Sequence, residues 1–294
     1  MRTFLVSTAV IAIAVAGAGL WISRPKPVDA ASFASLTPDA ARGEAVFHAA
    51  GCASCHAAPG AEGEDKRVLA GGQRFASEFG TFIAPNISPD PAQGIGDWSR
   101  EDFANAVMRG VSPGGQHYYP AFPYTAYQNA TPQDIADLYA YMMGLPASDA
   151  PSAAHEIAFP YNIRRGVGLW KAVYMTRDWH MTDPASDAEE RGRYLVEALG
   201  HCAECHTPRT ALGGLDRDNW MAGAPNPSGR GRIPDITAAG LGWGAFDIAA
   251  YLESGFTPDF DVVGGSMAEV VENFARLPAS DREAVAAYLL RAGE

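Results

Sequence analysis

The sequence is poor in cysteine and in positive charge, and it has no long apolar run after residue 30. Its 294 residues include four cysteines, and 22 lysines and arginines face 34 aspartates and glutamates, for a formal net charge of −12. So few cysteines exclude a disulfide-rich scaffold. The acidic balance argues against nucleic-acid binding, because phosphate backbones repel negative charge. The sequence also lacks a Ser/His/Asp set, a phosphate loop and a dinucleotide fingerprint.

The N-terminus carries the one long apolar segment. Residues 3–22 have no charged side chain, and twenty residues at ~1.5 Å each just cross a ~30 Å hydrocarbon layer. One interpretation is a signal peptide cleaved after Ala16 or Ala30. The other is an uncleaved signal anchor, which the length and Trp21 at the far interface favour. Both predict export to the periplasmic side of a bacterial inner membrane.

The rest of the chain repeats itself. The four cysteines form two Cys-x-x-Cys-His motifs, at 52–56 and 202–206. Later landmarks such as Trp98 and Trp243 recur at a constant offset of 145 residues. A duplication is therefore predicted. The expected organisation is a signal or anchor at 1–30, a first domain at 31–145, a connector at 146–185 and a second domain at 186–294.

An all-α fold is expected, with at least three helices in each unit. The predicted helices are 38–50, 99–109 and 131–143 in the first unit, and 186–199, 245–254 and 280–291 in the second. Gly110 and Gly255 should end the middle helices, and Thr131 and Ser280 should cap the last ones. The aromatic and basic connector segment, 159–174, should pack across both units.

The cysteine motifs predict covalent haem. Two thiols one helical turn apart add across the two vinyl groups of haem, and the adjacent histidine supplies an axial nitrogen. A redox pair or half a zinc site does not account for a following histidine that occurs twice. Two covalently bound c-type haems are therefore predicted, held by Cys52, Cys55 and His56 and by Cys202, Cys205 and His206.

The second axial ligand differs between the units. Met267, in a glycine-rich loop, is the expected sixth ligand of the second iron, where a thioether raises the potential. The equivalent position in the first unit is Phe122, which cannot bind iron. His117 on the same loop is the candidate there, and its alternative role is structural or propionate-binding. Pro85 and Pro234 are expected to orient the motif histidines through their carbonyls.

At this point the sequence resembles a known family. Both halves resemble class I cytochrome c domains, and the exported part is similar to the cytochrome c subunits of bacterial membrane-associated dehydrogenases, such as quinoprotein alcohol dehydrogenases and molybdenum hydroxylases. In that family the first-half loop often carries methionine where this chain has Phe122. The resemblance is carried by residues 84–90, 94–98, 119–124, 138–141, 159–162 and 206–209.

The resemblance implies an electron carrier rather than an enzyme. Such a chain accepts electrons from a partner dehydrogenase and passes them toward a quinone or a terminal oxidase. The acidic surface suits a basic partner. The alternative is a redox enzyme that uses an open first haem, peroxidase-like or thiosulfate-oxidising, and Phe122 keeps that hypothesis open. No catalytic residues are expected for the carrier.

Overall fold

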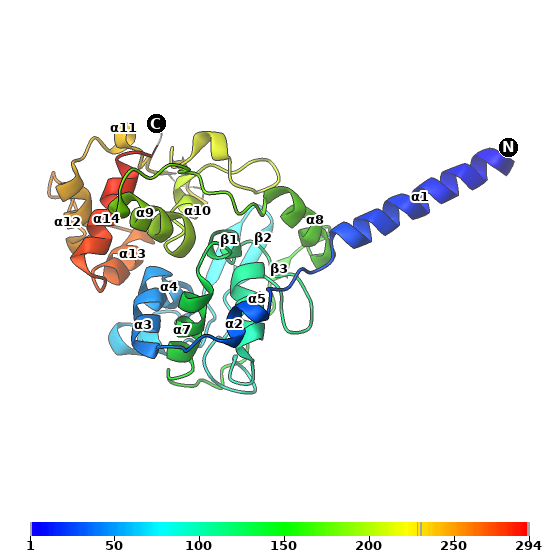
Figure 1. Ribbon diagram of the computed structural model, residues 1–294, viewed down its shortest axis with the longest axis horizontal. Coiled ribbons are helices and arrows are strands. Elements are labelled where there is room, and N and C mark those ends of the chain that lie inside the picture. Colours follow the sequence, from blue (N-terminus) through cyan, green and yellow to red (C-terminus); the bar gives the residue numbers. More distant parts are fainter. Residues whose placement is uncertain (1, 228, 230, 293–294) are drawn as a thin grey trace.

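The computed structural model describes residues 2–227, 229 and 231–292, without the side chains of residues 2, 3 and 5. The predicted boundaries at residues 1 and 294 therefore lie outside the described residues. The described chain is mostly helical, as expected, with a few short strands. Figure 1 shows a body made of two groups of helices, from which one long N-terminal helix projects.

The helices of the first half, residues 31–145, begin and end close to their predicted positions. Thr131 accepts a hydrogen bond from the Asp134 amide and caps the last helix, and Gly110 ends the middle helix in the left-handed region at φ 57°. Both were predicted from sequence. The elements are α2 Ala31–Ala34, α3 Ala40–Ala49, α4 Cys52–His56, η1 Gly63–Arg67, α5 Arg100–Arg109, α6 Tyr124–Tyr127 and α7 Pro132–Met142.

The second half, residues 186–294, follows the same order with two departures. The predicted cap at Ser280 is wrong, because the last helix already begins at Ala279, directly after Pro278. The predicted helix 186–199 changes to a π-helical turn for its last six residues. The elements are α9 Asp187–Arg193, η2 Tyr194–Leu199, α10 Ala203–His206, η3 Arg217–Asn219, α11 Ala238–Leu241, α12 Ala245–Ser254, α13 Met267–Phe274 and α14 Ala279–Leu289.

In both halves the first long helix crosses the last one at a glycine. A Cβ atom on Gly43 of α3 would lie 2.0 Å from the Asp137 carbonyl oxygen of α7. A Cβ atom on Gly192 of α9 would lie 2.0 Å from the Ala284 carbonyl oxygen of α14. Only glycine permits this approach, so the two helix pairs share one packing solution.

Short antiparallel strands supplement the helices, and the sequence did not predict them. In the first sheet β2 lies between β1 and β3, so the connector strand β3 is tied to the first half. Strands of two to four residues carry too little alternation to be recognised. They are β1 Arg74–Ser77, β2 Gly80–Ile83 and β3 Glu156–Ile157, and β4 Ala224–Pro225 with β5 Arg232–Ile233.

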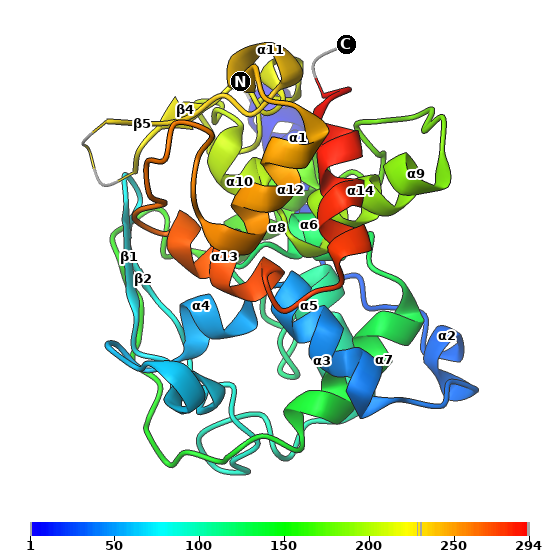
Figure 2. The same cartoon turned by 90° about the vertical axis from the view of Figure 1, so that its left-hand side faces the viewer.

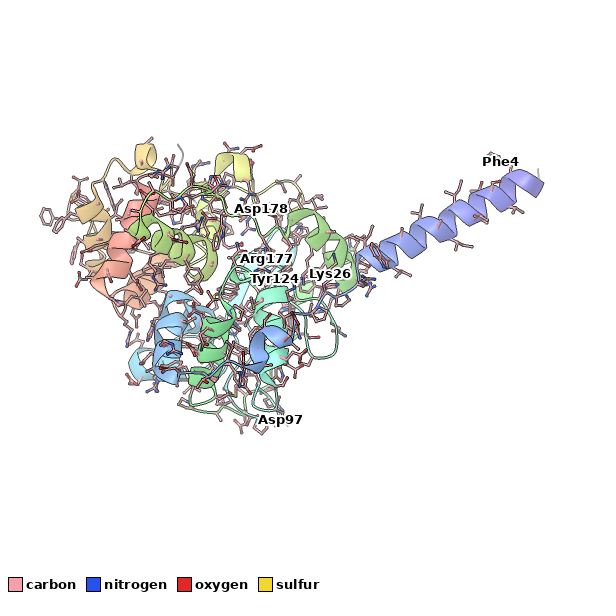
Figure 3. All side chains as sticks on the ribbon, viewed as in Figure 1. Phe4, Lys26, Asp97, Tyr124, Arg177 and Asp178 are labelled. Carbon is pink, nitrogen blue, oxygen red and sulfur yellow. The ribbon has the colours of Figure 1, made fainter. Side chains whose placement is uncertain are left out.

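The N-terminal helix α1, Arg2–Ile22, meets the connector helix α8, Arg164–Tyr174. Figure 3 shows Phe4 near the outer end of α1 and Lys26 where the chain enters the body. Arg165 Nη2 donates to the Leu20 carbonyl at 2.6 Å. Among the described residues, no helix combines the length and the apolar character that crossing a membrane requires.

The connector helix contacts both halves, as predicted. Lys171 Nζ donates to the Arg109 carbonyl of the first half at 2.6 Å. Trp170 Nε1 donates to the Leu212 carbonyl of the second half at 2.9 Å. The helix therefore fixes the two halves relative to each other.

Candidate cofactor site

Each Cys-x-x-Cys-His motif forms a single helical turn at the end of the first long helix of its half. Gly51, at φ 60°, turns the chain into α4. His201, at φ 41°, takes the same place before the second motif. One helical turn brings cysteines three positions apart to the same side. None of the four cysteines forms a disulfide.

The two motif histidines are oriented by proline carbonyls. His56 Nδ1 lies 2.9 Å from the Pro85 oxygen, and His206 Nδ1 lies 2.8 Å from the Pro234 oxygen. A carbonyl can only accept, so Nδ1 carries the hydrogen and the Nε2 lone pair is left for a metal. This contact, predicted from the position of both prolines, is confirmed.

Two glycines, which the sequence analysis missed, bring the proline segments close. Gly71 and Gly223 donate their amides to the carbonyls of His56 and His206 at 2.7 and 2.8 Å. Both have positive φ, +72° and +75°, and a Cβ atom on either would come within 2.7 Å of the chain around its proline. Only glycine fits at both positions.

The protonation states suit metal binding. Burial lowers the pKa of His56 and of His206, although the bonds to Pro85 and Pro234 oppose the change. Both imidazoles are therefore neutral near pH 7, the form that ligates a metal. Burial also raises the pKa of Cys52 and of Cys202 to about 12, so these two side chains do not compete with the histidines as anionic metal ligands near pH 7.

The second cysteine of each motif, Cys55 or Cys205, is exposed, whereas the first is half-buried. Burial, followed by the nearby Cys205 thiol and the Glu269 carboxylate, raises the pKa of Cys55 to about 11. Two cysteines beside an imidazole with an available Nε2 fit haem c in each half.

Met267, the expected sixth ligand, and its counterpart Phe122 occupy comparable places in the two halves. Met267 is the first residue of α13, half-buried against the core. Phe122 precedes α6 and is half-buried, with its ring centroid 5.9 Å from that of Tyr127. Met267 as a ligand stays a prediction, and the Phe122 position offers no donor atom.

His117 lies among residues of the connector and the N-terminal segment. Its Nε2 lies 2.8 Å from the Ser23 oxygen, and its Nδ1 lies 3.2 Å from Lys171 Nζ. Both ring nitrogens are thus engaged away from the first motif. This arrangement favours the structural role that the sequence left open for this histidine.

The two motifs face each other across the interface between the halves, and each is held by the opposite half. Asn273 Nδ2 of α13 donates to Ser54 Oγ in the first motif at 3.0 Å. Thr125 Oγ1 of α6 donates to Glu204 Oε1 in the second motif at 2.9 Å. Figure 2 shows α13 directly beside α4. We refer to these two bonds as the reciprocal clasp.

Sequence reasoning could not find the reciprocal clasp. Ser54 and Glu204 occupy variable positions of their motifs, and their partners lie 219 and 79 residues away. His201 adds a further contact, with its ring centroid 5.6 Å from that of Tyr127 in the first half. Such pairs become visible only when the two halves are packed together.

Comparison with known proteins agrees with this geometry. The family profile of cytochrome c matches residues 40–146. A "Diheme cytochrome c-type" protein of Cereibacter sphaeroides is 53% identical over 291 residues, covering 99% of this chain and 98% of that protein.

Two further relatives are parts of dehydrogenases and are longer than this chain. The fructose dehydrogenase cytochrome subunit of Gluconobacter japonicus is 37% identical over 90% of this chain and 55% of its own length. The gluconate 2-dehydrogenase cytochrome c subunit of Pantoea cypripedii is 34% identical over 89% of this chain and 63% of its own length. The chain therefore belongs to the cytochrome c family, and its relatives include a dihaem c-type cytochrome and the cytochrome subunits of dehydrogenases.

Proposed function

We propose that this chain is a periplasmic electron carrier made of two tandem class I cytochrome c domains, each with one covalent haem. It would take electrons from a partner dehydrogenase and deliver them to a quinone or a terminal-oxidase pathway. The observation that carries this proposal is the reciprocal clasp. Because Asn273 and Thr125 each bond to the opposite motif, the two sites are held face to face.

Each half supplies the groups that a c-type haem needs. Bound haem iron supplies one-electron oxidation and reduction. The thiols would tether it, and the Pro85 and Pro234 carbonyls fix the ring orientation of His56 and His206, which would hold the iron. Met267 would close the second site and raise its potential.

The partner and the compartment follow from the relatives and from the N-terminus. The names of the fructose and gluconate dehydrogenase relatives support a dehydrogenase as the donor. The apolar residues 3–22 support export, either as a cleaved signal or as an anchor. The mass of the mature protein distinguishes these, because cleavage after Ala16 or Ala30 removes most or all of α1.

A redox enzyme is the second candidate, and Phe122 is the observation that favours it. Without a thioether at this position, the first iron would keep a place for a small ligand, such as a peroxide or a sulfur oxyanion. Carbon monoxide is the probe. An enzyme would bind carbon monoxide at the first site and would also turn over a peroxide or a sulfur oxyanion there, whereas a carrier would show no such turnover.

Intramolecular electron equilibration tests the carrier directly. The oxidised protein receives less than one electron per chain from a pulse of a small radical reductant, and the absorbance is followed. A carrier with facing sites redistributes the electron at a rate that does not depend on protein concentration. If redistribution occurs only between molecules, at a rate proportional to concentration, the proposed function is wrong.

A further inference from the structure

The turn between α12 and α13 has a structural counterpart between α5 and α6. Val111 pairs with His117 in an isolated antiparallel bridge, and Phe256 pairs with Val262 at an offset of 145. The backbone hydrogen bonds match as well. The Ser112 amide donates to the Gln116 carbonyl at 2.8 Å, and its counterpart Thr257 donates to Asp261 at 2.9 Å. The Tyr118 amide donates to the Gly110 carbonyl at 2.7 Å, and its counterpart Val263 donates to Gly255 at 2.8 Å.

The two bridge residues of the first turn are covered by α8 and the N-terminal segment, while the tip of that turn, residues 113–116, is exposed. Val111 is 6% exposed and His117 is 4% exposed. Lys171 Nζ donates to the Gly110 carbonyl at 2.8 Å, and Arg164 Nη1 donates to the His117 carbonyl at 3.1 Å. The cover is therefore an apolar and basic helix whose cations bind the carbonyls at the helix end and on the turn.

The second turn has no cover within the described residues. Phe256, Phe260 and Val262 are 52%, 87% and 63% exposed. Phe256 and Val262 are bridge partners, so their side chains lie side by side. Figure 1 places this turn, between α12 and α13, at the end of the body opposite α8. We call these three residues the apolar turn.

Phe260 combines an unfavourable backbone conformation with an exposed ring. Its φ is +63°, and its counterpart in the first turn is Gly115 at φ +74°. A side chain in this left-handed region costs about 1–2 kcal/mol. No burial offsets the cost, since the ring is 87% exposed. Strain of this kind is characteristic of binding surfaces.

The charges on the apolar turn itself and along the chain on either side of it are negative. Asp259 and Asp261 lie on the turn itself, and no lysine or arginine occurs between Arg232 and Arg276. The first turn shows what such a surface accepts, namely apolar contact together with Lys171 and Arg164. An acidic rim around aromatic side chains complements a basic surface with an apolar centre.

We infer that the apolar turn docks a redox partner protein whose contact face carries lysine or arginine around an apolar centre. The inference rests on the proposed function, because the turn leads within five residues to Met267 and would place the partner beside the second site. Phe260 is its anchor, and Asp259 contributes to orientation and to the association rate.

Binding of a lysine-rich monohaem cytochrome c tests the inference. Both proteins are fully oxidised, so that no electron transfer is needed, and Kd is measured by calorimetry at low and high salt. Phe260→Gly restores the glycine of the first turn and should keep or raise the thermal stability. We expect it to raise Kd about tenfold, and Asp259→Asn to raise Kd less and to weaken its salt dependence.

The control is Phe159→Ala, at an aromatic residue 77% exposed that precedes α8, and it should leave Kd unchanged. Equal Kd values for wild type and Phe260→Gly would overturn the inference. So would a wild-type dimer in sedimentation that Phe260→Gly dissociates, because the occupant would then be a second copy. Loss of electron equilibration with Kd still dependent on Phe260 would refute the proposed function and leave the docking surface intact.

Discussion

The two halves share the groups that would hold a cofactor. They differ at the position of the sixth iron ligand and in the exposure of one turn. Both have a glycine helix crossing, a histidine oriented by a proline carbonyl and a motif bonded to the opposite half. The first half carries Phe122 and a turn covered by α8, whereas the second carries Met267 and an exposed turn. The helix crossing and the histidine geometry are thus common to both halves, while the bridge residues of the turn are buried in the first half and exposed in the second.

Removal of one cysteine pair at a time should have the largest effect on the comparison. Cys202→Ser with Cys205→Ser should leave one covalent haem per chain, and Cys52→Ser with Cys55→Ser should leave the other. Each half contains only one pair of cysteines that could attach a haem. Intact mass after denaturation counts the haems, and two haems on either double variant would contradict the assignment.

Exchange of the axial position should make the halves more alike. Met267→Ala should turn the second iron high-spin and lower its potential, because a thioether ligand is lost. Phe122→Met should add a thioether to the first site and raise its potential. Redox titration with optical spectra measures both. An unchanged spectrum after Met267→Ala would show that this side chain only packs against the core.

The glycine crossings should respond equally if the scaffold is shared. Gly43→Ala and Gly192→Ala each place a Cβ atom 2.0 Å from a carbonyl oxygen, and we expect each to cost about 3 kcal/mol in unfolding free energy. Gly166→Ala in α8 is the control, since no atom lies within 4 Å of its Cβ position. Chemical denaturation measures all three, and a large loss in only one half would break the equivalence.

Lowering the pH should destabilise the two halves over different pH ranges, with a smaller effect on the unfolding free energy than the glycine substitutions. Burial, followed by Arg217, lowers the pKa of His180 to about 4; this histidine lies in the connector, and its ring stacks on Trp220 of the second half with centroids 4.6 Å apart. The unfolded chain therefore takes up the proton first. Stability is full above pH 6.5 and falls by about 2 kcal/mol toward pH 4, which is less than the full pKa shift implies because solvent screens the half-buried ring.

The matched variant and a residue of the first half complete the pH test. His180→Phe should keep the stacking and lose the acid sensitivity between pH 6.5 and 4, as measured by denaturation at each pH. In the first half, burial acts to raise the pKa of Asp137. Hydrogen bonds from Arg42, the Asp39 amide and Gln133 outweigh burial and lower this pKa. The stabilisation that the Asp137 carboxylate provides is therefore lost only below pH 3.8, the ordinary pKa of this group. Equal acid sensitivity of wild type and His180→Phe would contradict the role of this histidine.

Local signals predicted most helices and the groups that face the cofactor. The Thr131 cap, the Gly110 and Gly255 helix ends and the Pro85 and Pro234 carbonyls all follow from residue type and repeat position. These features are encoded within a few residues or recur in both halves.

What the sequence could not predict depends on packing between distant segments. The Ser54 and Glu204 partners lie in the opposite half, and the left-handed Phe260 contradicts the glycine preference of its position. Ser280 was wrongly predicted as the cap because serine is a good capping residue. The helix in fact begins one residue earlier, at Ala279 directly after Pro278.

Circular dichroism in the Soret region tests the facing of the two sites most directly. Two haems held close together couple their transitions and give a band with two lobes of opposite sign. The account predicts this bisignate band for the wild-type protein and a band of one sign for each single-haem cysteine variant. A wild-type spectrum equal to the sum of the two single-haem spectra would contradict it.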